Sequence, residues 1–225
     1  MKGLQQAGAD GDGVGGRGGG STSCPITAMS RSRKVIVTKK RSFYAYSELW
    51  HASRCVLETG IVQTKGSSWQ FLASAVLTAF AFEAYLNHVG PRTIECWLQL
   101  DRLPPWSKFN LLCEILGVQF PKGPEARPLQ TVKKLLAFRN AVAHGSSEEI
   151  KAKPETRNAD DKLDAYLGIQ PLTDWERLIQ RSDFAKRARE DVQTVLERLH
   201  EGRRDKDKEA LFTFGIGVHG ATVIE

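Results

Sequence analysis

The segment 135–145 carries the side chains best suited to chemistry, because Arg139, Asn140 and His144 close an otherwise apolar stretch that stops at Gly145. An arginine stays charged and can fork onto phosphate oxygens. A histidine titrates near neutrality, so it can take a proton from a ribose 2′-hydroxyl or give one to a leaving 5′-oxygen. Asn140 can orient the histidine or hold a phosphate oxygen. These three groups would suffice to cleave RNA by internal transesterification without a metal.

The same residues also have a purely structural interpretation. Asn140 and His144 are four residues apart and share a helix face, whereas Arg139 lies about 140° from His144 on an ideal helix. Arg139 would then pair with a carboxylate, Asn140 would solvate the helix end and His144 would cap it. The spacing alone does not separate the two interpretations, since an arginine-rich chain produces it by chance.

Apolar residues recur at helical spacing through most of the chain, and we expect an all-α fold, an up-and-down bundle of four or five main helices. The segment from Trp69 to Val89 is apolar nearly all round, which places it at the centre of the bundle. A Thr173/Glu176 pair fits a capping box. The predicted helices span about 42–62, 69–89 (ending at Gly90-Pro91), 92–102, 106–116, 128–144 and 173–202.

The two ends of the chain differ from this central part. Residues 1–32 form a glycine-rich leader that we expect to be disordered. The bundle is predicted over residues 33–205, where Val35–Val37 is either a short strand or the entry to the first helix. Residues 146–171 are polar and irregular, with a helical turn expected near 163–167. Residues 206–225 are a tail whose apolar part either adds an edge strand or covers an exposed patch.

Composition narrows the function classes. The net charge of +6 favours acidic partners, nucleic acid among them. The N-terminus lacks the apolar core of a signal peptide, and the most apolar stretch is interrupted by polar residues, so we expect a cytoplasmic protein without a membrane span. The four cysteines form no Cys-x-x-Cys pair, and His51 with Cys55 lacks a second pair of ligands, so no metal or cofactor is expected.

On these residues the chain resembles the HEPN superfamily of helical domains. The motif of that superfamily is an Arg, usually followed by a polar residue, with a His four to six residues after the Arg, and Arg139-Asn140-Ala-Val-Ala-His144 matches it. The segment Phe82-Glu-Ala-Tyr-Leu-Asn87 is similar to the second helix of bacterial members. The resemblance covers about residues 42–200.

The resemblance implies a metal-independent endoribonuclease of the kind found among toxins, phage-defence proteins and RNA-processing enzymes. It also implies a homodimer that brings two motifs into one composite cleft, which suits the small residues Ala137, Ala141 and Ala143, and an antitoxin protein as a possible partner. Other members are catalytically silent and bind nucleotide, RNA or a protein. One subgroup carries a Tyr two residues after the His. Here that residue is Ser146, so regulation by nucleotide transfer to a tyrosine is not expected.

Two polar residues of the central helix complete the predicted site. Glu83 and Asn87 are one turn apart in apolar surroundings, and a buried carboxylate needs a partner. We expect Glu83 to anchor Arg139 or His144, the alternative being a pair with another basic residue. His51, His88, His200 and His219 have no comparable context and are expected to be ordinary surface or helix-end residues.

Overall fold

The computed structural model describes residues 34–147, 149–152, 154–156, 166, 168–205, 209–215 and 217–224. The glycine-rich leader predicted over residues 1–32 lies outside them, as does nearly all of the turn predicted at 163–167. The described part is mostly helical, with seven helices and one two-stranded sheet. The helices are α1 (Ala45–Val62), α2 (Ser67–Thr93), α3 (Trp97–Leu100), α4 (Pro105–Leu116), α5 (Leu129–Ala143), α7 (Asp174–Ile179) and α8 (Asp183–Gly202).

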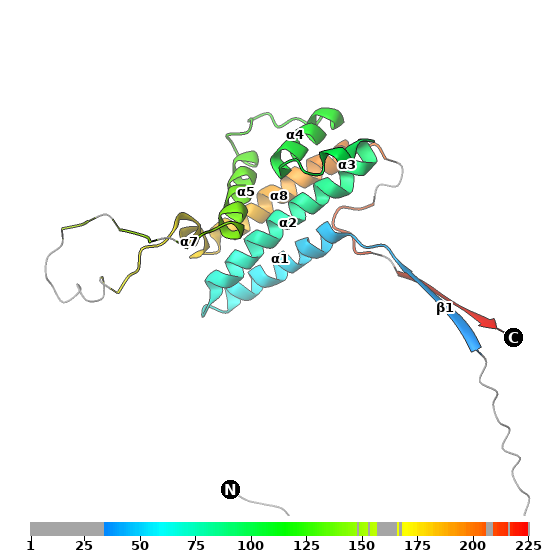
Figure 1. Ribbon diagram of the computed structural model, residues 1–225, viewed down its shortest axis with the longest axis horizontal. Coiled ribbons are helices and arrows are strands. Elements are labelled where there is room, and N and C mark those ends of the chain that lie inside the picture. The colour runs from blue at the N-terminus through cyan, green and yellow to red at the C-terminus, as the bar shows by residue number, and fades with distance from the viewer. Residues whose placement is uncertain are drawn as a thin grey trace, which may run out of the picture. The chain divides into compact units, whose positions relative to one another are not determined.

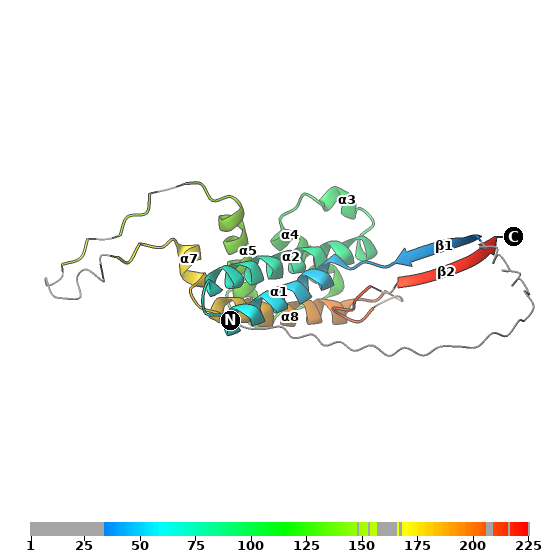
Figure 2. The same cartoon turned by 90° about the horizontal axis from the view of Figure 1, so that it is seen from below.

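Helix α2 is the centre of the helical unit, which comprises residues 39–219. It contacts each of the other six described helices, and its neighbour α1 lies alongside it in both views (Figures 1 and 2). Its buried residues lie on one half of the helix, whereas the opposite half, which includes the exposed Phe80, is intermediate or exposed, so the apolar pattern is wider than the buried face. The buried residues include Phe71, Phe82, Tyr85, Leu86 and Val89.

Helix α2 is also long and apolar enough to cross a membrane, with a mean hydropathy of 1.2 over its best window. Half of that window is buried within the protein. The core helix of a soluble protein meets the same criteria of length and composition, so α2 alone is weak evidence for a membrane span.

Three of the predicted helix ranges were wrong. Helix α2 does not stop at Gly90-Pro91 but continues to Thr93, because a proline this close to the end removes one backbone hydrogen bond and the last turn still closes through Ile94 N–H to Gly90 O at 2.8 Å. The predicted helix over 92–102 is correspondingly reduced to the four residues of α3. The predicted 173–202 helix is broken at residues 180–182 into α7 and α8. The Thr173/Glu176 capping box is confirmed at the start of α7.

A small sheet corrects the all-α prediction. Strand β1 (Lys34–Arg41) pairs with strand β2 (Gly217–Ile224), and Thr38 Oγ1 lies 3.4 Å from Gly220 O. Residues 34–41 and 217–224 therefore form strands, the first of the alternatives that the sequence left open at each end of the chain. Sequence periodicity could not select it, because each strand satisfies its backbone groups only through a partner about 180 residues away.

The helical unit extends beyond residue 205, where the bundle was predicted to end. Leu211 and Phe212 pack against the core, and the Phe212 ring stacks on Trp50 with centroids 4.4 Å apart and planes 6° from parallel. Part of the predicted C-terminal tail thus covers the bundle, and the remainder forms β2.

Gly90 provides a test of how closely α2 packs. A Cβ built at Gly90 would lie 2.2 Å from the ring of Trp97, a distance that real contacts do not reach. Helix propensity alone predicts that Gly90→Ala stabilises the protein by about 1 kcal/mol. We expect the opposite sign, a loss of about 1–3 kcal/mol in the free energy of unfolding, because the ring must move. Urea denaturation followed by circular dichroism measures it.

The matched control is the same substitution made in a Trp97→Ala background. There the ring is absent, so Gly90→Ala should become neutral or stabilising. A destabilisation of equal size in both backgrounds would show that contact with Trp97 is not the cause.

Candidate functional site

Helix α5 positions the predicted motif through its buried side. Leu135, Leu136 and Phe138 lie in the core, and the chain just before α5 is attached to α8 by Arg127, whose Nε and Nη2 donate to the two carboxylate oxygens of Asp191 at 2.8 and 2.9 Å. The last turn of α5 is consequently held at a fixed place beside α2. Arg139 and Asn140 lie on this turn, and His144 is the C-cap residue.

Arg139 points toward α2. Its Nη2 forms an ion pair with Glu83 Oε2, its Nη1 donates to Asn140 Oδ1 at 2.9 Å, and its Cζ lies 5.8 Å from the centre of the Phe80 ring. The side chain is 17% exposed and that of Glu83 is 28% exposed, so the pair is largely but not completely removed from solvent. The Glu83–Arg139 contact is one of the two that the sequence led us to expect.

One donor of Arg139 is unused. Its Nε is buried and has no hydrogen-bond partner among the described residues. A guanidinium carries five N–H donors, and an unmatched buried donor costs free energy. Glu83 and Asn140 therefore orient the guanidinium without saturating it.

Asn140 and His144 are exposed and occupy the surface next to this pair. The backbone N–H of His144 donates to Asn140 O at 2.9 Å, which closes the helix, while its imidazole makes no hydrogen bond or ion pair within the described part of the chain. The structure thus brings Arg139, Asn140 and Glu83 together and leaves His144 free beside them. It does not place the imidazole in contact with the guanidinium.

Asn87 does not belong to this site, contrary to expectation. Its Oδ1 accepts a hydrogen bond at 2.9 Å from Lys108 Nζ, which also lies 3.3 Å from Asp101 Oδ1. Lys108 is 2% exposed, and a buried ammonium needs such oxygens around it. Asn87 lies one helical turn beyond Glu83, and that turn is enough to direct it to α4 and away from α5.

The face of α5 opposite the core is uncovered. Ala137, Ala141 and Ala143 are all exposed, as are Asn140 and His144. Phe80, which lies against Arg139, is 40% exposed. The small side chains of these alanines leave room for another helix to approach closely.

Comparison of the chain with models of known protein families, with curated proteins and with solved structures produced no match. The assignment of a function therefore depends on the residues and their geometry.

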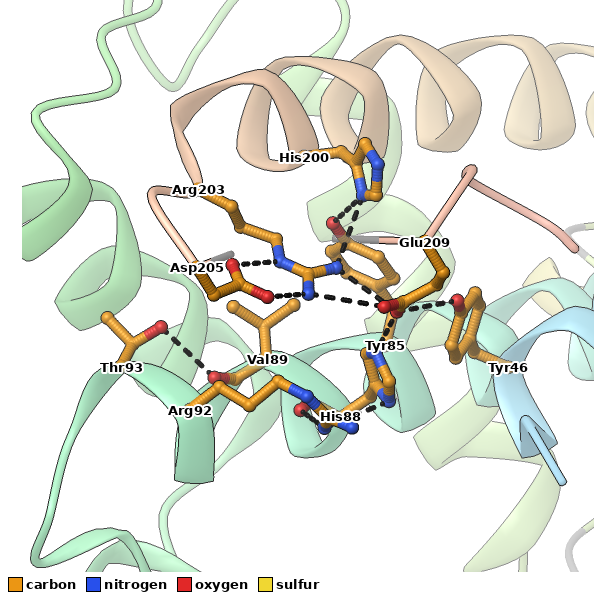
Figure 3. A network of polar contacts seen from close by, with 10 residues as sticks. All are labelled: Tyr46, Tyr85, His88, Val89, Arg92, Thr93, His200, Arg203, Asp205 and Glu209. Atoms are coloured by element: carbon orange, nitrogen blue, oxygen red, sulfur yellow. Dashed lines mark hydrogen bonds and ion pairs between the residues drawn. The ribbon is translucent and has the colours of Figure 1, made fainter. Parts of the chain in front are cut away.

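A second polar cluster was missed by the sequence analysis. Arg203, just after α8, is fully buried and donates from Nε to Asp205 Oδ1 at 2.8 Å and from Nη1 to Glu209 Oε1 at 3.2 Å (Figure 3). Glu209 also accepts from Tyr46 Oη at 3.3 Å and forms an ion pair with His88. The cluster attaches the segment after α8 to α1 and α2.

Two histidines expected at the surface belong to this cluster. His88 contacts Glu209 and Arg92, and His200 Nδ1 lies 3.0 Å from Tyr85 Oη. His51 also has a defined contact elsewhere, since its ring stacks on Phe214 at 4.1 Å. No local signal marks these roles, because Glu209, Tyr85 and Phe214 each lie more than a hundred residues from the histidine that they contact.

The cluster has strongly altered proton affinities. Burial opposes the charge of Glu209, but hydrogen bonds from Arg203 and His88 outweigh it and lower the pKa of Glu209 to about 2. Burial lowers the pKa of His88, against the hydrogen bond to Glu209. Burial also raises the pKa values of the Tyr46 and Tyr85 hydroxyls. At neutral pH Glu209 is thus an ionised carboxylate, and Arg203, His88 and Tyr46 are its hydrogen-bond and ion-pair partners.

These shifts define a pH dependence of stability. Glu209 has a folded pKa of about 2 against an ordinary value of 4.5, so its contribution is complete above about pH 4.5 and is lost as the pH falls toward 2. The pKa of His88 is also lowered from its ordinary value of 6.5, so protonation of His88 likewise reduces the stability of the fold as the pH falls below 6.5. We expect Glu209→Gln to lower the free energy of unfolding at pH 7 by about 3 kcal/mol, because it leaves Arg203 short of a carboxylate.

The measurement is urea denaturation at a series of pH values. Glu209→Gln should give a flatter curve of stability against pH between about 5 and 2, since the titrating group is gone. Glu114→Gln, at an exposed position of α4, is the matched control and should follow the unsubstituted protein. Equal acid sensitivity in all three proteins would show that Glu209 is not the group responsible.

Proposed function

We propose that the protein is a metal-independent endoribonuclease with a HEPN-like bundle, and that Arg139, Asn140 and His144 form its active site. The observation that carries the proposal is the Arg139 guanidinium, 17% exposed and oriented by Glu83 and Asn140, on the last turn of α5, which His144 follows with an exposed side chain.

The proposed reaction is an internal transesterification. His144 takes the proton of the ribose 2′-hydroxyl, the 2′-oxygen forms a bond to phosphorus, and the bond from phosphorus to the 5′-oxygen breaks. The leaving 5′-oxygen gains a proton and the products are a 2′,3′-cyclic phosphate and a 5′-hydroxyl. Arg139 stabilises the charge that builds up on the phosphate oxygens, and Asn140 holds a phosphate oxygen or orients the imidazole. General acid–base catalysis contributes about 10²–10⁴ in rate and a positioned donor about 10²–10³.

Two copies of the chain would supply both proton transfers. His144 of one subunit would act as the base and His144 of a second copy as the acid, across a composite cleft formed by the exposed face of α5. The small side chains Ala137 and Ala141 on that face, with the exposed Ala143 at the end of the helix, support a close approach of two helices. A cytoplasmic location, inferred from the sequence composition, belongs to the proposal, and an antitoxin partner and a role in defence follow from the family resemblance alone.

A second candidate is a non-catalytic dimeric module that binds nucleotide, RNA or a protein. It is favoured by the Glu83–Arg139 pair, which neutralises the arginine, and by the absence of a contact between Arg139 and the imidazole of His144 among the described residues. The two candidates differ in whether purified protein cleaves RNA.

The first test is cleavage in the presence of a chelator. We expect the unsubstituted protein to cut single-stranded RNA and leave 2′,3′-cyclic phosphate ends, and we expect His144→Ala and Arg139→Ala each to lower the rate by about 10²-fold or more. His219→Ala, which removes an exposed histidine of β2, is the matched control and should cleave normally. Circular dichroism verifies that each variant is folded.

Full activity in His144→Ala would rule out the proposed active site. Absence of cleavage by the unsubstituted protein, with RNA or nucleotide still bound, would favour the non-catalytic module.

The second test concerns the dimer. Ala141→Glu places a charge on the exposed face of α5, and we expect it to convert a dimer into a monomer and to abolish cleavage, because a desolvated unpaired carboxylate is costly at an interface. Light scattering after size-exclusion chromatography gives the mass. Ala52→Glu, at an exposed alanine of α1, is the control and should remain dimeric. A monomeric unsubstituted protein that cleaves RNA would exclude the composite cleft.

A further inference from the structure

A second positively charged feature of the helical unit is a hollow of about 260 Å³ between α5, α7 and α8. Four basic side chains line it: Lys134 from α5, Arg177 from α7, Arg181 from the break between α7 and α8, and Arg187 from α8. All four are exposed. The two-helix arrangement that replaces the predicted single helix is what turns Arg177 and Arg181 toward the same hollow as Arg187.

The charges at this hollow are only partly compensated. Asp183 is the one carboxylate in its lining, and Arg177 lies 3.3 Å from Asp174 in a surface ion pair of the kind that contributes little. Lys134, Arg181 and Arg187 have no carboxylate within 4.0 Å in the described part of the chain, where ion pairs are otherwise numerous. Like charges gathered without partners repel one another, and an anionic ligand would relieve that repulsion.

The hollow also has an apolar floor. Leu178 and Phe184 belong to its lining, and the Lys134 ammonium lies 5.8 Å from the centre of the Phe184 ring. Phe184 in turn packs on Phe138 of α5 with centroids 5.3 Å apart. The cations are therefore carried by a rigid, packed surface, and two of them lie on helices that are fixed by the core.

The hollow and the proposed active site share helix α5. Lys134 precedes Arg139 by five residues and His144 by ten, which corresponds to about 7.5 and 15 Å along the helix axis. Guanidinium groups fit phosphate geometry, and single-stranded nucleic acid is commonly bound by a row of cations that follows its backbone. A single short oligonucleotide is long enough to reach both places.

We propose that the hollow lined by Lys134, Arg177, Arg181 and Arg187 binds the phosphodiester backbone of the RNA strand next to the linkage that is cut. The assignment of RNA as the ligand rests on the proposed function. The hollow supplies affinity that does not depend on base sequence, and the groups at Arg139 and His144 supply the chemistry.

The test measures binding apart from cleavage. Fluorescence anisotropy with a short labelled oligouridylate is recorded in a His144→Ala background with chelator present. We expect Arg181→Gln/Arg187→Gln to weaken binding roughly tenfold and to lower the slope of log affinity against log salt by about 1.4, or about 0.7 for each lost phosphate contact. Arg102→Gln/Lys122→Gln removes the same charge from two exposed cations outside the hollow and is the matched control.

The outcomes separate this proposal from the proposed function. Equal binding by the hollow and control variants overturns the hollow, even where the unsubstituted protein cleaves RNA. A selective loss in the hollow variant supports it, even where no RNA is cleaved. Oligouridylate crosslinked through 4-thiouridine should attach to peptides of α7 and α8, and attachment only elsewhere would contradict the proposal. Polyglutamate that competes as well as RNA would identify a general polyanion site and overturn the assignment to RNA.

Discussion

The burial of α2 is the constraint on which the rest of the structure depends. A helix of 27 residues can remove its apolar side chains from water only by contact with other helices, and α2 contacts all six of the other described helices. The close packing of α2 explains why a glycine is needed at position 90, where the Trp97 ring lies against the helix backbone. It also determines where the few polar side chains of α2 can find partners.

Two of those polar residues, Glu83 and His88, lead to two different polar centres. Glu83 meets Arg139 of α5, and His88 meets Glu209 in the segment after α8. The centre around Arg203 is complete, since its guanidinium has two carboxylates and His88, Tyr46 and Tyr85 all have partners. The centre around Arg139 has one carboxylate, that of Glu83, and the exposed Asn140, and its ion pair is partly open to solvent. A completed network stabilises the fold, whereas a partly exposed guanidinium is accessible to a ligand.

Helix α5 links the proposed chemistry to the proposed binding of the strand. Its buried side packs into the core through Leu135 and Phe138, so the helix holds Lys134 and Arg139 at fixed positions. Catalytic and binding groups on a helix are held more accurately than groups on a loop. In the proposed dimer, the small exposed residues of helix α5 contact a second subunit.

The sequence by itself determined the parts that depend on local patterns. Helical periodicity located α1, α2, α4 and α5, the Thr173/Glu176 pair located the start of α7, and the spacing of Arg139, Asn140 and His144 identified the candidate site. Glu83 was found because a carboxylate among apolar neighbours requires a cation. Only the tertiary structure decided that β1 pairs with β2, that Asn87 serves Lys108, and that His88 and His200 belong to a buried network. Those outcomes depend on partners brought together from distant parts of the chain, 121 residues apart for His88 and Glu209 and 115 for Tyr85 and His200, and no local pattern records such contacts.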